Sequence, residues 1–249
     1  MSDPVFITEV FSSIQGEGFL AGRRQIFIRL ADCNLDCRYC DTDYSRQDTC
    51  RVEMRPGSAT FNHLPQPLSP QELVGLIIRW NESLPGAHHS ISITGGEPLM
   101  HAEALTLLLP GLRSILPIHL ETNGTMPDAL KRVIPYLNYI SMDMKLPSTS
   151  GCDQHLWGLH QSFLESSIGH AVSIKVVIAE NTGLDEIYRV CDIINQSGPS
   201  IPLFLQPVTL STGDPGITPA RILLLQEAAS SVLGDVRVIP QMHRMLGAL

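Results

Sequence analysis

This sequence has little basic charge and no long apolar run. Lys and Arg number 17 against 25 Asp and Glu, so the formal net charge is −8. A sequence-independent nucleic-acid binder needs clustered basic charge to displace counterions from phosphates, so a small-molecule substrate is favoured and no nucleic-acid partner is expected. No apolar stretch approaches the ~18 residues that a membrane-spanning helix needs. No membrane segment is therefore expected.

The start of the sequence also has no basic segment. The first twenty residues contain Asp3, Glu9 and Glu17 but no Lys or Arg, unlike a secretory signal. A cytoplasmic location is therefore expected. The sequence has no internal repeat and no low-complexity tract. Its apolar residues at 43% and charged residues at 17% are typical of a globular protein, and a single domain over residues 1–249 is expected.

Cysteine is scarce, and half of it is scattered. The scattered cysteines are Cys50, Cys152 and Cys191. They are interpreted as buried or incidental thiols, because free Cys behaves as a small hydrophobe. The remaining three are organised: Cys33, Cys37 and Cys40 fall within one stretch of eight residues. Only this triplet indicates a site.

Short apolar runs alternate with helix-like stretches, which is the pattern of βα units around a parallel sheet. The expected strands are 25–30, 90–93, 117–120, 139–142, 171–178 and 201–205, with 5–10 as an edge strand at the start. Helices are expected over 70–83, with Ser69 as the N-cap, and over 219–233. Residues 45–68 show no sustained period and are expected to form an inserted loop. These elements predict an α/β fold, an incomplete (β/α) barrel of about six parallel strands that is open on one side.

Unusual polar segments follow the expected strands. They are Arg29 with the cysteine loop, 94–98 (Thr-Gly-Gly-Glu-Pro), 121–124 (Glu-Thr-Asn-Gly), Asp143 with Lys145, and Gln206 with Pro207. A parallel barrel brings the carboxyl ends of its strands to one face, where such enzymes place their active sites. Any one of these segments could be an ordinary turn, but together they predict one site.

The cysteine triplet suits an iron–sulfur cluster. Three soft thiolates directly after a strand can bind three corners of one cluster. The fourth iron then stays open to a small molecule. Zinc is the alternative, but structural zinc takes four protein ligands, and the next candidates, Cys50 and His63, form no tight second pair.

The triplet spacing, the aromatic Tyr39 before the last cysteine and the later 95–98 segment (Gly-Gly-Glu-Pro) resemble the radical S-adenosylmethionine (SAM) superfamily. The resemblance implies that the open iron binds the amino and carboxylate groups of SAM. It also implies that the glycine-glycine-glutamate segment contacts the methionyl amine.

A narrower resemblance covers nearly the whole chain apart from 45–68. The segments that carry it are 13–18 (Ser-Ile-Gln-Gly-Glu-Gly), 22–23, 27–29, 33–35, 40–42, 121–124, 175–178, 205–207 and 238–243. Together they are similar to the 7-carboxy-7-deazaguanine synthases. This resemblance implies a radical SAM lyase that contracts the ring of 6-carboxytetrahydropterin, with loss of ammonia, to a precursor of queuosine. It also implies a 4Fe-4S cluster, SAM, Mg²⁺, an electron donor such as flavodoxin or ferredoxin, and a homodimer.

The resemblance assigns roles by position, and it assigns no side chain a catalytic role because SAM carries the radical. The cluster ligands are Cys33, Cys37 and Cys40, and the magnesium ligand is Thr42. The SAM contacts are Tyr39, Cys40, Asp41, Gly96, Ser141, Lys145 and Gln206. The substrate contacts are Ile14, Gln15, Gly16, Glu17, Arg29, Thr94 and His243.

Some alternatives stay open. Arg29 can instead form a structural ion pair, Thr42 a loop hydrogen bond, and His243 a surface or packing contact. The chain also has Ser-Met-Asp-Met-Lys at 141–145 where the family's short forms have serine-proline-lysine, so Asp143 is a further candidate for the SAM site.

Two other functions remain. One is a glycyl-radical-enzyme activase, which shares the triplet but acts on a protein backbone. The 15–18 segment (Gln-Gly-Glu-Gly) before the first strand argues against this alternative. The other is a non-catalytic zinc-binding module. Metal and inorganic-sulfide analysis separates a cluster from zinc.

Overall fold

The computed structural model describes residues 5–153, 155–198 and 200–248. Within these residues, one sheet runs in the order β10-β9-β8-β7-β6-β5-β2-β1-β3-β4. The strands are β1 (Ile7–Ile14), β2 (Arg24–Leu30), β3 (Thr49–Glu53), β4 (Phe61–Pro65), β5 (Ser90–Gly95), β6 (Ile118–Thr122), β7 (Tyr139–Asp143), β8 (Ala171–Ile178), β9 (Leu203–Pro207) and β10 (Val236–Val238).

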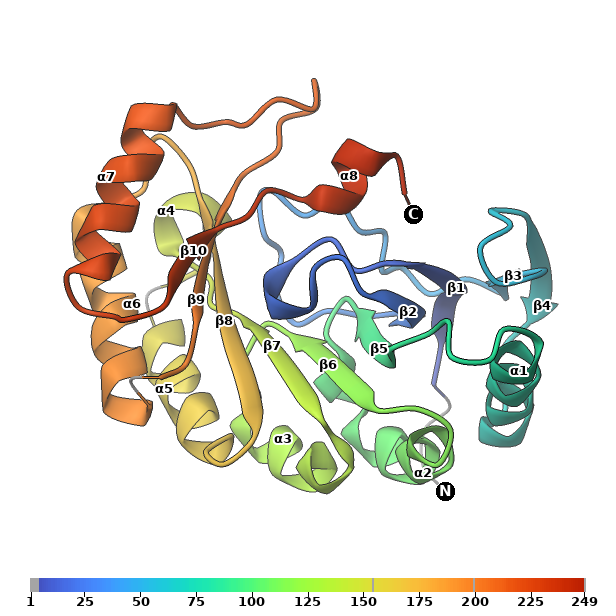
Figure 1. The fold of residues 1–249 in the computed structure, drawn as a ribbon. Coiled ribbons are helices and arrows are strands. Elements are labelled where there is room, and N and C mark those ends of the chain that lie inside the picture. The colour runs from blue at the N-terminus through green and yellow to red at the C-terminus, as the bar shows by residue number, and fades with distance from the viewer. Residues whose placement is uncertain (1–4, 154, 199, 249) are drawn as a thin grey trace.

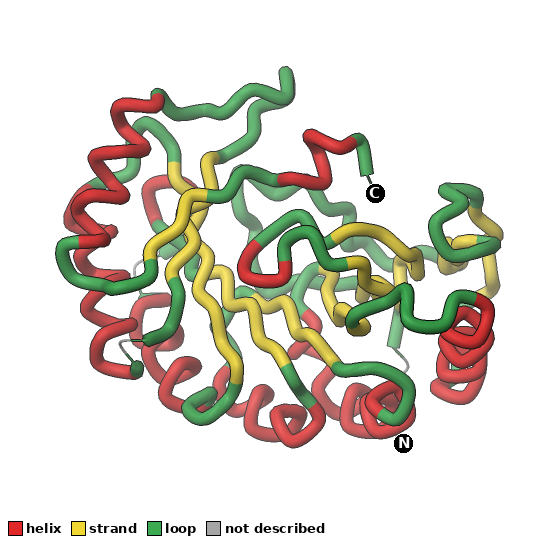
Figure 2. Tube along the Cα trace, viewed as in Figure 1, coloured by secondary structure: helices red, strands yellow, loops and turns green. Residues whose placement is uncertain are grey.

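Helices follow the outer side of the curved sheet (Figure 1, Figure 2). The helices of the described residues are α1 (Pro70–Ser83), α2 (Ala102–Arg113), α3 (Pro127–Val133), α4 (Pro147–Ser150), α5 (Leu156–Ser166), α6 (Leu184–Ser197), α7 (Pro219–Ser230) and α8 (Met242–Leu246), with short 3₁₀ turns at Gly18–Leu20, Pro98–His101 and Ile134–Tyr136. The short helix α8 is different, because it lies across the sheet from α2 and α3 (Figure 1). Among the described residues, none of these helices is both long and apolar enough to cross a membrane.

Strands β2 and β5 to β10 are parallel neighbours, and β1 pairs with β2 in the antiparallel sense. The sheet has two ends, β4 and β10, so it is not closed. The predicted incomplete barrel is confirmed. It has one parallel strand more than expected, because β10 is only three residues long and was not recognised in the sequence.

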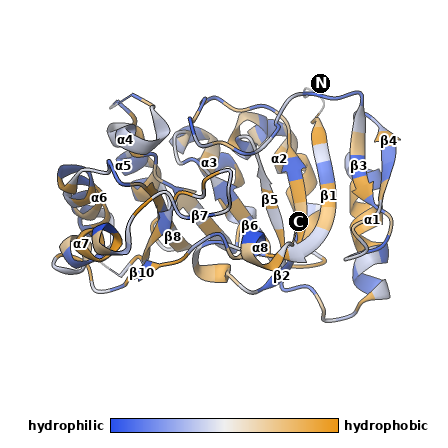
Figure 3. Cartoon of the chain, turned by 90° about the horizontal axis from the view of Figure 1, so that it is seen from above, coloured by the Kyte–Doolittle hydropathy of each residue, from blue (hydrophilic) through white to orange (hydrophobic). Residues whose placement is uncertain are grey.

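The parallel strands are apolar because helices cover their outer face, as is usual in βα folds. Ile93, Ile140 and Ile174 are fully buried, and Figure 3 shows hydrophobic segments along the strands in the middle of the molecule. The helix predicted over 70–83 is confirmed at both ends. Ser69 caps it by accepting from Glu72 N, while the Glu72 carboxylate accepts from Ser69 N, which is a capping box. The helix predicted over 219–233 ends at Ser230.

Two expectations about the N-terminal quarter are wrong. The strand expected at the sheet edge over 5–10 is β1, which lies between β2 and β3 because the insert supplies a further strand. The segment 45–68, expected to be an irregular loop, contains β3 and β4, which pair as an antiparallel hairpin. In β3 the side chains of Cys50 and Val52 are buried while Arg51 is exposed. This alternation is the period of a half-buried strand, but it is too short to stand out in the sequence.

Candidate active site

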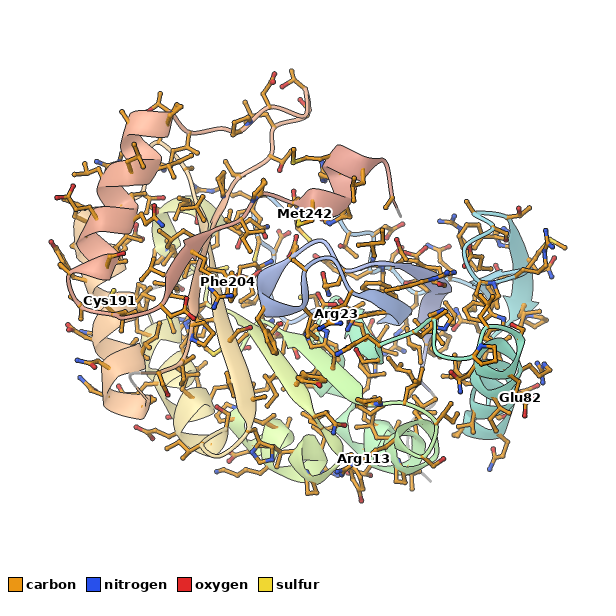
Figure 4. All side chains as sticks on the ribbon, viewed as in Figure 1. Arg23, Glu82, Arg113, Cys191, Phe204 and Met242 are labelled. Carbon is orange, nitrogen blue, oxygen red and sulfur yellow. The ribbon has the colours of Figure 1, made fainter. Side chains whose placement is uncertain are left out.

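The carboxyl ends of the parallel strands face one cleft of about 750 Å³. The loop between β1 and β2 and the helix α8 lie beside each other at this face, where Met242 N donates to Gly16 O at 3.0 Å. Figure 4 labels Met242 there, far from Arg113 at the end of α2. Every predicted site residue lines this cleft: Ile14, Gln15, Gly16, Glu17, Arg29, Cys33, Cys37, Tyr39, Cys40, Asp41, Thr42, Thr94, Gly96, Ser141, Lys145, Gln206 and His243.

The cysteine loop leaves the end of β2 through a left-handed residue. Asp32 has φ of +66°, which Asp tolerates better than most residues. Asn34 then fixes the loop against the end of β6: Asn34 Nδ2 donates to Thr125 Oγ1 at 2.9 Å, and Asn34 Oδ1 accepts from Asn123 Nδ2 at 2.8 Å. All three thiols of the triplet are free.

Two glycines allow the ends of β2 and β5 to approach closely. A Cβ on Gly95, whose φ is +141°, would lie 2.2 Å from Leu30 O, and a Cβ on Gly96 would lie 2.0 Å from Asp32 O. Any side chain at either position would therefore push the cysteine loop away from β5. Gly96 lines the cleft.

Glu97, in contrast, points away from the cleft into the protein. Its carboxylate accepts from Leu99 N at 2.9 Å, from Thr122 Oγ1 at 2.9 Å and from Asn123 N at 2.7 Å. Burial raises the pKa of Glu97, and these hydrogen bonds oppose that rise. In this structure the Glu97 side chain thus joins the loop after β5 to the end of β6, while Gly95 and Gly96 before it line the cleft.

A partly buried network of alternating charges lines the cleft. Lys175 on β8 lies between two carboxylates, with Nζ 2.5 Å from Glu17 Oε2 and 3.0 Å from Asp143 Oδ2. Lys145 Nζ lies 2.8 Å from the same Asp143 oxygen and over the Tyr39 ring, 5.3 Å from its centroid. The network joins the β1–β2 loop to β7, β8 and the cysteine loop.

The network holds its groups in their charged forms. Burial opposes ionisation of Glu17, but the charge of Lys175 and the hydrogen bonds from Lys175 and Gln241 lower its pKa to about 2. Burial likewise opposes the charges on Asp143 and Lys175, yet their pairing lowers the pKa of Asp143 and raises the pKa of Lys175. Asp143 pairs with Lys145 as well, whose pKa is raised far above its ordinary value despite burial. Two negative and two positive charges therefore balance.

Unpaired polar atoms lie next to this network. Within the described residues, Tyr39 OH and Asp143 Oδ1 are buried and have no hydrogen-bond partner. Buried polar groups normally have one. These two atoms are therefore suited to a polar group that binds in the cleft.

A chain of hydrogen bonds through the buried Gln25 and His119 connects Gln15 and Glu121 with Ser141, and these last three residues line the cleft. Gln15 Nε2 donates to Glu121 Oε1 at 3.0 Å and to Gln25 Oε1 at 3.1 Å. His119 is fully buried, and its ring nitrogens lie 3.2 Å from Gln25 Nε2 and 2.8 Å from Ser141 Oγ. Burial lowers the pKa of His119 to about 3, so the ring is neutral. Gln25 can then donate to Nδ1, and the Nε2–H donates to Ser141.

Glu121 also accepts from Ser92 Oγ, and burial raises the pKa of its carboxyl group. It therefore adds a carboxyl group at the end of β6 beside Gln15.

Arg29 lies at the end of β2 at the other wall. Its Nε donates to Glu9 Oε1 at 2.7 Å, and Glu9 Oε2 lies 3.4 Å from Arg51 Nη1. Two cations thus share one carboxylate, which leaves a net positive charge. Arg51 comes from β3 and packs over the Phe61 ring on β4, 4.3 Å from the ring centroid. The insert therefore contributes a cation to the cleft.

The C-terminal segment forms part of the wall of the cleft through Gln241, His243 and Arg244. A Cβ on Gly16 would lie 2.1 Å from His243 Nδ1, so the glycine is needed for His243 to pack there. Arg244 forms an ion pair with Asp41 next to the last cysteine. Thr42 follows, and its carbonyl oxygen lies 3.9 Å from Cys40 Sγ.

Some residues of the cleft had no assigned role in the sequence analysis. They are Glu9, Arg51, Glu121, Lys175 and Gln241. Lys175 lies within β8, and a single Lys in a mostly apolar strand was the one feature of the sequence that could have indicated a site residue there. Glu9 and Arg51 gave none, because their pairing depends on β3 being a strand next to β1.

Comparisons with known proteins agree with this geometry. Residues 28–157 match the radical SAM superfamily. The chain is 48% identical, over 98% of its length and 97% of the relative's length, to the 7-carboxy-7-deazaguanine synthase of Geobacter sulfurreducens. The chain belongs to the 7-carboxy-7-deazaguanine synthase family.

More distant members of the family extend the same match. The 7-carboxy-7-deazaguanine synthase of Methanothermobacter thermautotrophicus is 36% identical over 97% of the chain and 96% of that relative. The crystal structure of QueE from Escherichia coli superposes with a TM-score of 0.65 at 23% identity, covering 96% of the chain and 94% of that structure. The similarity to the Escherichia coli structure concerns the fold alone.

Radical SAM enzymes use an iron–sulfur cluster and SAM, and the thiols of this cleft fit that cluster. Cys33, Cys37 and Cys40 lie on one loop and line one cleft. Burial raises the pKa of Cys33 and Cys37, the latter to about 12, and the charge of Lys145 acts against this rise. Among the described residues, no three His, Cys, Asp or Glu side chains converge as ligands of a single ion do. A four-iron cluster instead takes thiolates at separate corners.

Proposed function

We propose that this chain is a 7-carboxy-7-deazaguanine synthase, which contracts the ring of 6-carboxytetrahydropterin with loss of ammonia and so supplies a precursor of queuosine. The observation that carries the proposal is the β1–β2 loop, whose Gln15 and Glu17 line the same cleft as the cysteine loop, in a chain of this family. The cluster and SAM, when bound, supply the radical that abstracts hydrogen. The protein holds the reactants close together and excludes water.

We assign the cofactors to the half of the cleft beside the cysteine loop, Asp143 and Lys145. Cys33, Cys37 and Cys40 would hold the 4Fe-4S cluster. The SAM contacts would be Tyr39, Cys40, Asp41, Gly96, Ser141, Lys145 and Gln206, together with Asp143. The partnerless Tyr39 OH and Asp143 Oδ1 support this placement, because the ammonium and hydroxyl groups of SAM can hydrogen-bond to such atoms.

The substrate would occupy the half lined by Ile14, Gln15, Gly16, Glu17, Arg29, Thr94 and His243. Its aminopyrimidinone edge has donors and acceptors that suit the Gln15 amide and the Glu17 carboxylate. Its carboxylate suits the guanidinium of Arg29, whose planar fork matches two carboxylate oxygens. Thr42 would supply an oxygen ligand for Mg²⁺.

The proposal also covers the domain organisation, the oligomeric state, the electron donor and the cellular location of the enzyme. We propose a single domain over 1–249 that includes the 45–68 insert, a homodimer, and flavodoxin or ferredoxin as electron donor. We place it in the cytoplasm, where free thiols stay reduced.

The test is anaerobic incubation of the reconstituted enzyme with SAM, a reductant, Mg²⁺ and 6-carboxytetrahydropterin, followed by mass analysis. A product lighter than the substrate by one ammonia, with SAM recovered, is expected. Consumption of SAM to 5′-deoxyadenosine without this product would contradict the proposal and favour a glycyl-radical-enzyme activase. Bound zinc without inorganic sulfide would favour a non-catalytic zinc-binding module.

A further inference from the structure

A fourth cysteine lies beside the cysteine loop. Cys152 follows α4 and the turn at Gly151, and its Sγ lies 3.8 Å from Cys37 Sγ. Both side chains are partly exposed and free. Cys152 has no role in the proposed reaction, so the contact of its thiol with a proposed cluster ligand requires another explanation.

The backbone fixes this contact from both sides. Arg38 N donates to Ser150 O at 3.0 Å, which joins the cysteine loop to the end of α4. Cys152 N donates to Ser150 Oγ at 3.1 Å. Gly151 makes the turn with φ of +75°, and a Cβ there would lie 2.6 Å from Arg38 Nε. The two thiols are therefore neighbours because of the turn, not because of a flexible side chain.

We propose that Cys37 and Cys152 form a reversible disulfide when the enzyme carries no cluster. A disulfide bond is about 2.05 Å long, so its formation requires the two sulfurs to approach by less than 2 Å. A sulfur bound to iron is not available for this bond, so cluster assembly and the disulfide exclude each other. The inference rests on the proposed role of Cys37 as a cluster ligand.

The oxidant is a peroxide, and the reaction balances. Hydrogen peroxide oxidises one thiol to a sulfenic acid and releases one water. The second sulfur attacks the sulfenic sulfur, the S–S bond forms, and the hydroxyl leaves as a second water with the thiol proton. Two thiols and one peroxide thus give one disulfide and two waters. Because sulfinic acids are irreversible in most proteins, the disulfide keeps Cys37 in a form that a thiol reductant can restore.

Trypsin allows a direct test on the full-length, cluster-free chain. Cleavage after Arg29, Arg38, Lys145 and Lys175 places Cys33 and Cys37 in peptide 30–38 and Cys152 in peptide 146–175. The reduced chain is treated with one equivalent of hydrogen peroxide, its free thiols are alkylated, and the digest is analysed without reduction. A linked pair of these peptides is expected. It should persist in Cys33→Ser and disappear in Cys37→Ser and Cys152→Ser.

A second measurement tests whether Cys152 protects the proposed cluster ligand Cys37 from irreversible oxidation. After peroxide and then dithiothreitol, the wild type should regain its capacity for anaerobic cluster assembly, read from iron and sulfide content. Cys152→Ser should assemble the cluster normally before peroxide and lose that capacity afterwards. A digest without the linked pair, a pair that depends on Cys33, or equal recovery in both proteins would overturn the inference. None of these readouts depends on the ring contraction, so the proposed function is tested separately.

Discussion

Arg29 presents its guanidinium at the cleft while Glu9 holds its Nε. Arg29→Lys should weaken substrate binding, because lysine is a point charge without the bidentate fork. Loss of a buried charge-assisted pair typically costs ~2–5 kcal/mol, so the substrate Kd should rise tens-fold or more. Slow SAM cleavage without substrate should persist. Equilibrium binding of the pterin measures the effect.

A matched control for this change is Arg237→Lys. Arg237 is more than half exposed and pairs with Asp235 at 2.7 Å on the surface, where ion pairs contribute little. This variant should bind substrate like the wild type. An Arg29→Lys enzyme with unchanged affinity would leave Arg29 as a structural partner of Glu9 only.

The cysteine triplet makes a prediction about cluster content. Replacement of Cys33, Cys37 or Cys40 by Ala should abolish SAM cleavage, because the cluster needs all three corners held. Cys50→Ala should retain it, since Cys50 is fully buried on β3 and serves packing. Iron and sulfide content and 5′-deoxyadenosine formation are the measurements. Normal SAM cleavage by any triplet variant would refute the cluster assignment.

Thr42 lines the cleft directly after the cysteine loop and has a hydroxyl oxygen. If its hydroxyl is a magnesium ligand, Thr42→Ala should lose most of the stimulation by Mg²⁺ while it still assembles the cluster. Thr42→Ser should keep the stimulation because the hydroxyl remains. Initial rates against Mg²⁺ concentration for the three proteins test this. An unchanged magnesium curve for Thr42→Ala would assign Thr42 to loop structure.

At the scale of elements, the contact between the ends of β2 and β5 is the tightest constraint on the site. Gly96→Ala should destabilise the protein, because the new Cβ would meet Asp32 O at 2.0 Å and backbone must move. Such overpacking costs roughly 1–3 kcal/mol, which lowers Tm by several degrees, and cluster content should fall as the cysteine loop shifts.

Gly158→Ala is the matched control. Gly158 lies inside α5 with open space around its Cα, so alanine should stabilise the helix by up to about 1 kcal/mol. Thermal unfolding of both variants and of the wild type compares the two changes. Equal Tm values for Gly96→Ala and the wild type would show that the strand ends can separate freely.

Elements with strong local signals could be predicted from the sequence. Helix α1 has apolar residues at helical spacing behind the Ser69 cap, and its predicted bounds are confirmed. Strand β8 has eight residues, apolar except for Ser173 and Lys175, and is also confirmed. The hairpin of β3 and β4 was missed because β3 is short, β4 is exposed and contains His and Asn, and the pairing with β1 is a long-range contact. Strand β10 was missed because it is only three residues long.

At the scale of the whole molecule, the topology of the sheet brings the site residues together. Parallel strands present their carboxyl ends on one side, so motifs that are far apart in the sequence could be assigned to one cleft. The partners inside that cleft could not be assigned. Glu17 and Lys175 are 158 residues apart, and no local pattern connects them. Likewise, the position of Cys152 beside Cys37 depends on the turn after α4.

The Glu17–Lys175 pair makes a prediction about acid stability. The pKa of Glu17 is lowered from 4.5 to about 2 in the folded protein. A lowered pKa means that the carboxylate stabilises the fold above pH 4.5, and that this contribution is lost as the pH falls from 4.5 towards 2. Glu17→Gln removes the charge and leaves Lys175 with Asp143 as its remaining carboxylate partner. The variant should therefore be less stable than the wild type at neutral pH.

The pH dependence of that difference separates charge from packing. The free-energy gap between wild type and Glu17→Gln should be constant between pH 6 and 8, because Glu17 stays ionised in both the folded and the unfolded chain. At pH 4 Glu17 is mostly protonated in the unfolded chain and still ionised in the folded one, so the gap should shrink by about 1 kcal/mol. Urea unfolding of the two proteins at pH 8, 6 and 4, with matched cluster content, measures the gap. A gap that does not change down to pH 4 would mean that Glu17 stabilises the β1–β2 loop by packing and hydrogen bonds alone.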